Sequence, residues 1–275
     1  MEKWLKFYLS AFILSLSISC SNNNNEKDAR TLAEERFKDA IFYRQGSVAF
    51  QNGIAEAVAI DPTYEPAVYE LSVADLKRGL PHKWLPQYNK AVTLNPEQRI
   101  PWRGYLYLWF YRDYEKAIAD FNASDSLTPY LDYPQGHSVD FWRGIAYLGA
   151  KDYDNSIAYW DKHITKETED SGEDWVELEA FLYRGIAYYE AGNSEKANEN
   201  FDKVIQFFRN SADAKYYKAK LFLNKGDKKA ALNMIDEAIV DFNNGYYNNR
   251  GYVETLRQIY LLDLEELKSK IIASN

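Results

Sequence analysis

Apolar residues recur at helical spacing through most of the 275-residue chain, and one stretch shows the pattern most clearly. Phe181, Gly185 and Tyr188 are spaced i, i+4 and i+7, so they share one face of a helix. Gly185 has no side chain, which lets a facing helix approach closely, although glycine costs a helix about 1 kcal/mol relative to alanine. Gly192 and Asn193 end this helix. The stretch therefore predicts a helix with an apolar face and a narrow seam.

A second amphipathic helix follows directly. Ser194 is a suitable N-cap, and Ala197 and Phe201 lie four residues apart on the face that turns back toward the first helix. Two helices joined in this way cannot bury their shared apolar stripe by themselves. Further copies are needed on both sides of the hairpin.

The sequence contains such copies. The segment from Arg143 to Tyr147 repeats the segment from Arg184 to Tyr188 residue for residue, and we interpret both arginines as structural. In the N-terminal half, a proline follows the end of each expected second helix, at Pro62, Pro96 and Pro129. Proline stops a helix and sets the turn into the next repeat. These endings define the register of the first three repeats.

This pattern resembles the tetratricopeptide repeat, a helix-turn-helix unit of about 34 residues with small and aromatic residues at fixed positions. The matching small residues are Gly144, Ser156, Gly185, Ala197, Ala219, Ala231 and Ala238. The resemblance implies an all-α fold, a right-handed α-solenoid of six such repeats over residues 31–243. After the first repeat, the others are expected at 65–96, 98–129, 137–168, 178–209 and 212–243.

Two insertions and one irregular spacing interrupt the repeats. Residues 130–137 form the first insertion, and 165–177 form a second that is rich in acids. These acids could bind a divalent cation, but their spacing matches no calcium loop, so a solvated loop is expected. Gly104 and Ala117 are separated by one residue more than the corresponding pairs of later repeats. This spacing predicts a local irregularity in the third repeat.

Residues 244–275 are expected to close the solenoid. The segment Asn243–Gly251 is rich in turn-forming residues, and Val253–Ile272 has the apolar spacing of an amphipathic helix. The open end of a solenoid needs a cap with a polar outer face. We therefore predict a C-terminal capping helix, with a partner-binding helix as the alternative.

The first residues form no part of the predicted fold. Lys3 and Lys6 give the chain a positive start and precede a short apolar segment, Phe7–Ile18, which is too short to span a bilayer. Small residues then lead to Cys20, and the arrangement resembles a bacterial lipoprotein signal, in which Cys20 would be lipidated. The leucine that usually stands three residues before the cysteine is absent. An ordinary secretory signal, with an incidental cysteine, is therefore the alternative.

Residues 1–19 are thus predicted to be a lipoprotein signal peptide, and residues 20–30 a flexible tether. Cys20 is the only cysteine, as suits an exported protein whose one thiol carries lipid. The asparagine run Asn22–Asn25 resembles the tethers of lipoproteins from the Bacteroidota. The resemblance implies an outer-membrane lipoprotein of the cell envelope. It leaves open whether the protein faces the periplasm or the cell surface.

Composition and motifs argue against several functions. The net charge of −8 provides no basic footprint for nucleic acid. No nucleophile elbow, phosphate loop, dinucleotide fingerprint or zinc-protease motif is present, so no enzyme activity and no cofactor are expected. The three histidines are far apart in the sequence, which predicts surface or packing roles and no metal site: His82, His137 and His163.

In the tetratricopeptide repeat family, the first helix of each repeat lines a concave groove. The residues that match the groove positions are largely aromatic, and the predicted peptide-binding residues are Tyr69, Tyr105, Trp109, Phe141, Tyr189, Tyr216 and Lys220. An exposed stripe of this kind suits a peptide that inserts anchor side chains. The chaperone-type carboxylate clamp is not expected, because apolar residues stand where its lysine and asparagine belong. The alternative is that loops or the C-terminal helix cover the groove.

These features together predict a membrane-tethered, non-catalytic scaffold that holds another protein or a peptide of the bacterial envelope. Three alternatives share the lipid anchor or the repeats. They are a lipoprotein of β-barrel assembly, a protein that neutralises a co-encoded toxin, and a sugar-binding lipoprotein, which needs a longer chain. An enzyme is the alternative from a different class.

Overall fold

The computed structural model describes residues 28–129 and 132–274, and over these residues the chain forms thirteen α-helices and no strand. The predicted all-α fold is therefore confirmed. The signal peptide 1–19 and Cys20 lie outside the described residues, so their roles stay predictions. In the part that is described, no helix is both long enough and apolar enough to cross a membrane.

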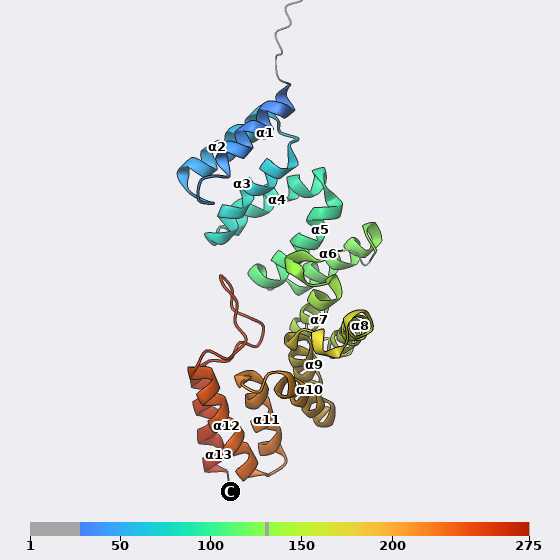
Figure 1. The fold of residues 1–275 in the computed structure, drawn as a ribbon, viewed down its shortest axis with the longest axis vertical. Helices are drawn as coiled ribbons and strands as arrows, with labels where there is room; N and C mark the ends of the chain where they lie inside the picture. Colours follow the sequence, from blue (N-terminus) through green and yellow to red (C-terminus); the bar gives the residue numbers. More distant parts are fainter. Residues whose placement is uncertain (1–27, 130–131, 275) are drawn as a thin grey trace, which may run out of the picture.

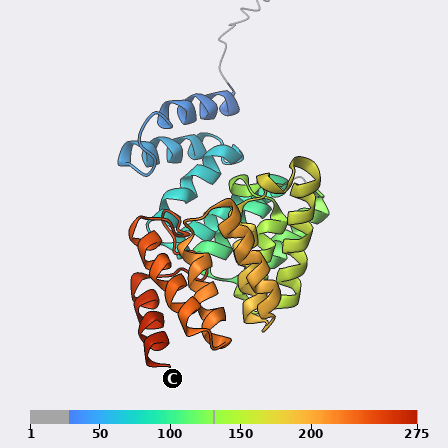
Figure 2. The same ribbon diagram turned by 60° about the horizontal axis from the view of Figure 1, so that its bottom comes forward.

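The first twelve α-helices form six successive hairpins. The pairs are α1 (Ala29–Ala40) with α2 (Val48–Ile60), α3 (Glu65–Lys77) with α4 (Pro81–Leu94), α5 (Pro96–Leu106) with α6 (Tyr114–Leu127), α7 (Val139–Gly149) with α8 (Tyr153–Ser171), α9 (Leu178–Glu190) with α10 (Ser194–Phe207), and α11 (Ala212–Asn224) with α12 (Lys228–Asn243). Figure 1 and Figure 2 show the hairpins stacked in a curved column, with α13 (Leu261–Ala273) beside α12 at its end.

Three clusters of buried apolar side chains hold the column together. The largest runs from Leu76 in α3 to Tyr217 and Leu221 in α11. A smaller cluster joins α1, α2 and α3, and another joins α11, α12 and α13. Because the largest cluster includes residues of five consecutive hairpins, from α3 to α11, these hairpins bury their apolar stripes against their neighbours, as stacked repeats require.

The glycines of the repeat lie at tight seams between the two helices of a hairpin. A Cβ atom at Gly185 would come within 2.7 Å of the Phe201 ring, and one at Gly144 within 2.6 Å of the Trp160 ring. Both distances are too short for atoms that are not bonded, so only glycine fits without displacing the ring. The close approach predicted for Gly185 is therefore confirmed.

The arginines that precede these glycines bind back to the preceding hairpin. Arg143 is buried, and it donates to the carboxylate of Asp125 in α6 at 2.5 Å and to the backbone carbonyl of Phe121 at 2.8 Å. Arg184 donates to Asp161 in α8 at 2.7 Å. Each arginine thus ties one repeat to the one before it, which supports the structural role inferred from the sequence.

The irregularity predicted in the third repeat is a short π-helix, η1 (Tyr107–Tyr111), which continues α5. The wider π-turn accommodates the additional residue between Gly104 and Ala117. Arg112 then adopts a left-handed conformation with φ of 54° and ends the segment. The hairpin keeps its seam, because Gly104 still faces the Phe121 ring.

Two local predictions were wrong. The N-cap of α10 is Asn193, whose side chain accepts from the Lys196 N–H at 3.1 Å, and Ser194 is the first helical residue. The predicted loop 165–177 is helical as far as Ser171, because α8 continues beyond the length of the other second helices. A short 3₁₀ turn, η3 (Glu173–Trp175), completes the connection.

The capping helix was predicted too long. Helix α13 begins at Leu261, and the residues from Val253 to Tyr260 are not helical. Leu256 and Ile259 are spaced like residues on one helical face, yet they belong to two different buried clusters. Their spacing therefore reflects an irregular segment with two separate anchors.

Candidate functional site

The connection between α12 and α13, residues 244–260, crosses the concave face of the column, and we call it the C-terminal loop (Figure 1). The backbone N–H of Asn248 donates to the Asp213 carboxylate at 2.7 Å, and its side chain donates to the Tyr183 hydroxyl at 3.0 Å. Arg257 forms two hydrogen bonds with Glu190 of α9, at 2.6 and 2.8 Å. The loop is therefore bound to α9 and α11 on the N-terminal side of Arg250, through Asn248, and to α9 on its C-terminal side, through Arg257.

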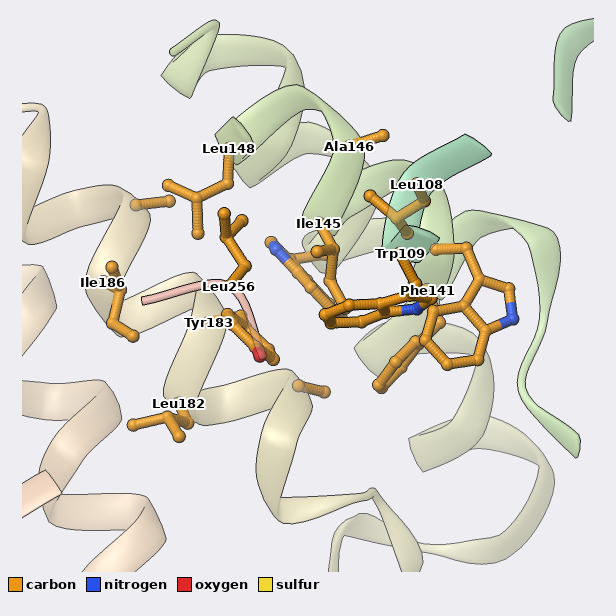
Figure 3. Packing of buried hydrophobic residues seen from close by; sticks show 14 of the residues in the cluster. Leu108, Trp109, Phe141, Ile145, Ala146, Leu148, Leu182, Tyr183, Ile186 and Leu256 are labelled. Atoms are coloured by element: carbon orange, nitrogen blue, oxygen red, sulfur yellow. The ribbon is translucent and has the colours of Figure 1, made fainter. Parts of the chain in front are cut away.

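The middle of the loop reaches the third and fourth repeats. The Arg250 guanidinium lies 5.0 Å from the centre of the Trp109 ring and 4.8 Å from that of Trp142. Leu256 inserts between α7 and α9, where Figure 3 shows it beside Tyr183 and Ile145. Cation–π contact and apolar burial both stabilise this position of the loop. The loop therefore covers the centre of the concave face.

Two predicted groove residues are inaccessible, for different reasons. Trp109 is only 2% exposed beneath Arg250, and Phe141 is fully buried. The Phe141 ring stacks on the His137 ring, with 4.2 Å between the ring centres, and its edge meets the Trp160 ring, with 5.0 Å between the centres. Phe141 therefore lies in the seam between α7 and α8. An open aromatic stripe through this region was the wrong expectation, because the C-terminal loop covers Trp109 and a helix seam buries Phe141.

The N-terminal half of the concave face keeps a pocket of about 450 Å³. Its lining is largely aromatic and includes two cations. We call it the aromatic pocket, and its principal residues are Tyr69, Trp102, Tyr105 and Phe110 together with Lys77 and Arg250. Burial raises the pKa of Tyr105, and the adjacent Arg250 acts in the opposite direction. Two of the predicted groove residues, Tyr69 and Tyr105, thus meet in one cavity.

The last three predicted groove residues form a separate cluster between α9 and α11. The Lys220 ammonium lies 4.9 Å from the centre of the Tyr189 ring and 5.1 Å from that of Tyr216. Burial lowers the pKa of Lys220. The seven predicted residues are therefore distributed over an open pocket, a covered centre and this aromatic cluster.

A polar cluster at the start of the fifth repeat was not predicted. The Glu177 carboxylate accepts hydrogen bonds from His137 Nδ1 at 3.1 Å and from His163 Nε2 at 3.0 Å. The other ring nitrogen of His163, Nδ1, forms a hydrogen bond with the Ser138 hydroxyl at 3.0 Å. Burial raises the pKa of Glu177, but the hydrogen bonds from the two histidines outweigh it and hold that pKa well below its usual range. The cluster joins the two insertions, which supports the packing role expected for these histidines. Among the described residues, no group of three or more His, Cys, Asp or Glu side chains is placed to hold a metal ion.

Sequence reasoning also missed four residues of the aromatic pocket: Lys77, Trp102, Phe110 and Arg250. Trp102 and Phe110 lie outside the positions carried over from the repeat family, and Arg250 lies outside the repeats altogether. The signal that could have revealed Arg250 is its place as the only cation in the turn-rich run Asn243–Gly251.

Comparisons with known proteins agree with this architecture. Residues 179–211 match the family model described as tetratricopeptide repeat. A search of curated proteins with this sequence finds no match.

Solved structures with the same fold are similar over most of the chain. One is Cut9–Hcn1 of the APC/C, with a TM-score of 0.58 and 14% identity over 90% of this chain and 46% of that one. Another is Pseudomonas aeruginosa pilF, with a TM-score of 0.59 and 16% identity over 88% of this chain and 99% of that one. A third is YrrB, described as a TPR protein with an unusual peptide-binding site. Its TM-score is 0.51, and its identity is 17% over 68% of this chain and 91% of that one.

The chain spans about half the length of the matched Cut9–Hcn1 chain, 46%. At 14–17% identity these similarities establish the fold and nothing about partners. Residues 179–211 form a tetratricopeptide repeat, and the chain as a whole has the all-α helical-repeat fold of tetratricopeptide repeat proteins.

Proposed function

We propose that this protein is a membrane-tethered, non-catalytic scaffold of the bacterial envelope, and that it holds a segment of another protein in the aromatic pocket. The observation that carries the proposal is the pocket itself, because it remains open on the concave face while the C-terminal loop covers the centre. Helical-repeat proteins of this kind hold other proteins or peptides. YrrB, which has the same fold, is described as having a peptide-binding site.

The dimensions and chemistry of the pocket suit this role. A volume of about 450 Å³ lies within the range of sites that accept a small ligand or the anchor side chains of a peptide. Aromatic walls provide large apolar contact at low entropic cost, and anchors of this type carry most of the energy in interfaces. Trp102 and Phe110 are only partly buried, so they are available to a partner.

Site-specific photocrosslinking tests the proposal in native membranes. A benzophenone amino acid replaces Trp102 in the pocket, and the matched control carries it at Trp175, which is 76% exposed on η3. We expect one defined protein to crosslink from position 102 and none, or a different set, from position 175. Equal capture of the same protein from both positions would contradict docking in the pocket.

The tether is tested separately, because Cys20 lies outside the described residues. Lipid on a single cysteine holds a protein at a membrane only through that residue, so Cys20→Ala should release the protein into the soluble fraction. Fractionation of cells that express the wild type and the variant measures this. A variant that still pellets with membranes, and is freed by detergent, would refute lipidation.

A further inference from the structure

The turn of the first hairpin exposes several large apolar side chains. After α1, Ile41 is 48% exposed, Phe42 87% and Tyr43 54%, and Val48 at the start of α2 is 77% exposed. Single exposed apolar residues are common on protein surfaces, but a group of them within one short run marks a place of contact with another molecule or with a membrane. We call these four residues the hairpin tip.

Hydrogen bonds hold the turn that carries the hairpin tip against the next repeat. The Gln45 side chain accepts from Lys77 of α3 at 2.7 Å and donates to Glu70 of α3 at 2.8 Å. Arg78 donates to the backbone carbonyl of Gly46. The turn is therefore fixed to the second hairpin, and the exposure of its apolar side chains is a property of the folded protein.

The charge around the hairpin tip suits the headgroup region of a membrane. The run 40–55 contains one cation, the exposed Arg44, and no acidic residue, although the whole chain has 41 acidic and 33 basic residues. The nearest acids in the sequence, Asp39 and Glu56, lie on α1 and α2. Tyrosine is enriched where a protein meets the membrane–water interface, as Tyr43 would here. The hairpin tip can thus enter that interface without carrying a carboxylate into it.

The hairpin tip also lies within reach of the membrane that the proposed lipid anchor defines. Cys20 is eight residues from Asp28, the N-cap of α1, and a chain of that length spans at most about 27 Å. Helix α1 has 12 residues, so it separates Asp28 from the tip by about 18 Å. Figure 1 and Figure 2 show this hairpin at the end of the column away from α13. An anchor at Cys20 therefore gives lipid a high effective concentration at the tip, which favours lipid over a second protein as the occupant.

We propose that the hairpin tip inserts into the interface of the bilayer to which the protein is tethered, as a second membrane contact besides the lipid on Cys20. This inference rests on the proposed function, because it needs the tether. A lipid on a flexible tether leaves the repeats free to rotate, whereas a second contact through Phe42 fixes their orientation. Gln45 of the same turn lines the aromatic pocket, so this contact would hold the pocket close to the bilayer.

A fluorescent label at the hairpin tip tests the inference in liposomes. The full-length lipoprotein with Tyr43→Cys is labelled with the environment-sensitive fluorophore NBD, since lipid occupies Cys20. It is reconstituted into phosphatidylethanolamine–phosphatidylglycerol liposomes with or without a lipid that is spin-labelled on its acyl chain. We expect blue-shifted emission and quenching by the spin-labelled lipid. The matched control carries the label at Leu262→Cys, an apolar position on α13 that is 63% exposed, and should show neither change.

A double substitution assigns the effect to the apolar side chains. Phe42→Ser with Val48→Ser keeps the tether and removes the two most exposed side chains of the tip. Burial of a phenylalanine side chain alone changes partitioning by a factor of about ten or more, so the label at position 43 should lose most of its quenching. Trp175→Ser, at another highly exposed apolar position, should leave the quenching unchanged. Circular dichroism checks that each variant remains folded.

The contrary outcomes separate this inference from the proposed function. If the protein floats with the liposomes but the label at position 43 behaves like the one at position 262, insertion of the tip is overturned and the tethered scaffold stands. A blue shift without quenching would mean that a second copy of the protein covers the tip, which also overturns the inference. So would quenching that survives Phe42→Ser with Val48→Ser. Protein that does not float with the liposomes would refute the lipid tether, and the proposed membrane attachment would fail with it.

Discussion

The two halves of the concave face are built from the same repeat and differ in access. In the N-terminal half, Tyr69 and Tyr105 line an open pocket. In the centre and the C-terminal half, Trp109 lies beneath Arg250 and Leu256 fills the space between α7 and α9. The repeat therefore determines where aromatic side chains stand along the column. A segment outside the repeats determines which of them a partner can reach.

The largest effect is expected at the covered centre. Trp142 is fully buried, donates to the Pro134 carbonyl at 2.7 Å and supports Arg250. Trp142→Ala should lower the free energy of unfolding by about 3–5 kcal/mol, as for other large-to-small core substitutions. Trp102→Ala in the open half should cost clearly less. Urea denaturation measures both, and equal losses would mean that the two halves do not differ in burial.

A second effect concerns the attachment of the loop. Burial raises the pKa of Asp213 to about 7, although the Asn248 N–H acts against it. Between pH 4 and pH 7 the folded protein keeps a proton on Asp213 that the unfolded chain releases, so this residue reduces stability as pH rises through that window. Asp213→Asn keeps an acceptor for Asn248 and removes the titration. The stability of the variant relative to the wild type should therefore increase from pH 4 to pH 7. The increase should be about 4 kcal/mol, because the pKa of Asp213 is raised by about three units and each unit corresponds to about 1.4 kcal/mol.

Thermal or urea unfolding of both proteins across that pH range gives the difference directly. Groups that titrate in both proteins cancel in the comparison. A constant difference between pH 4 and pH 7 would show that Asp213 is ionised throughout. In that case the loop is held by an ordinary carboxylate.

A smaller effect is expected at a seam that both halves share. Gly185→Leu must displace the Phe201 ring, and overpacking of this kind costs about 1–3 kcal/mol. Gly251 in the C-terminal loop is the matched control, because a Cβ atom there meets nothing within 4 Å. Gly251→Leu should leave the midpoint of unfolding nearly unchanged. Similar losses for both substitutions would mean that Gly185 has no special role at a seam.

The spacing of apolar and small residues predicted those features that depend on contacts between residues close together in the sequence. The six hairpins, the seam at Gly185 and the irregularity after Gly104 all follow from which residues recur at helical intervals. The path of the C-terminal loop could not be predicted in this way. Leu256 and Ile259 have helical spacing, and only their burial in separate clusters shows that the segment is not a helix.

The candidate site was predicted in part for the same reason. Periodicity indicates that Phe141 and Trp142 belong to a helix but does not determine which ring meets the groove. In the structure Phe141 packs in a seam, and Trp142 contacts Arg250. The positive charge of the aromatic pocket depends on Lys77 and Arg250, which are far apart in the sequence. Such a contact requires the tertiary structure.

The central claim is that the C-terminal loop lies across the concave face and reaches the second repeat. Intramolecular crosslinking tests it most directly: Lys77→Cys and Tyr252→Cys are combined in a Cys20→Ala background and treated with a short bismaleimide. Lys77 and Tyr252 are in contact in the structure, so the account predicts rapid crosslinking within one molecule. The control pair joins Lys77→Cys to Leu262→Cys on α13 and should react poorly. Equal reaction of both pairs, or none from Lys77→Cys with Tyr252→Cys, would contradict the account.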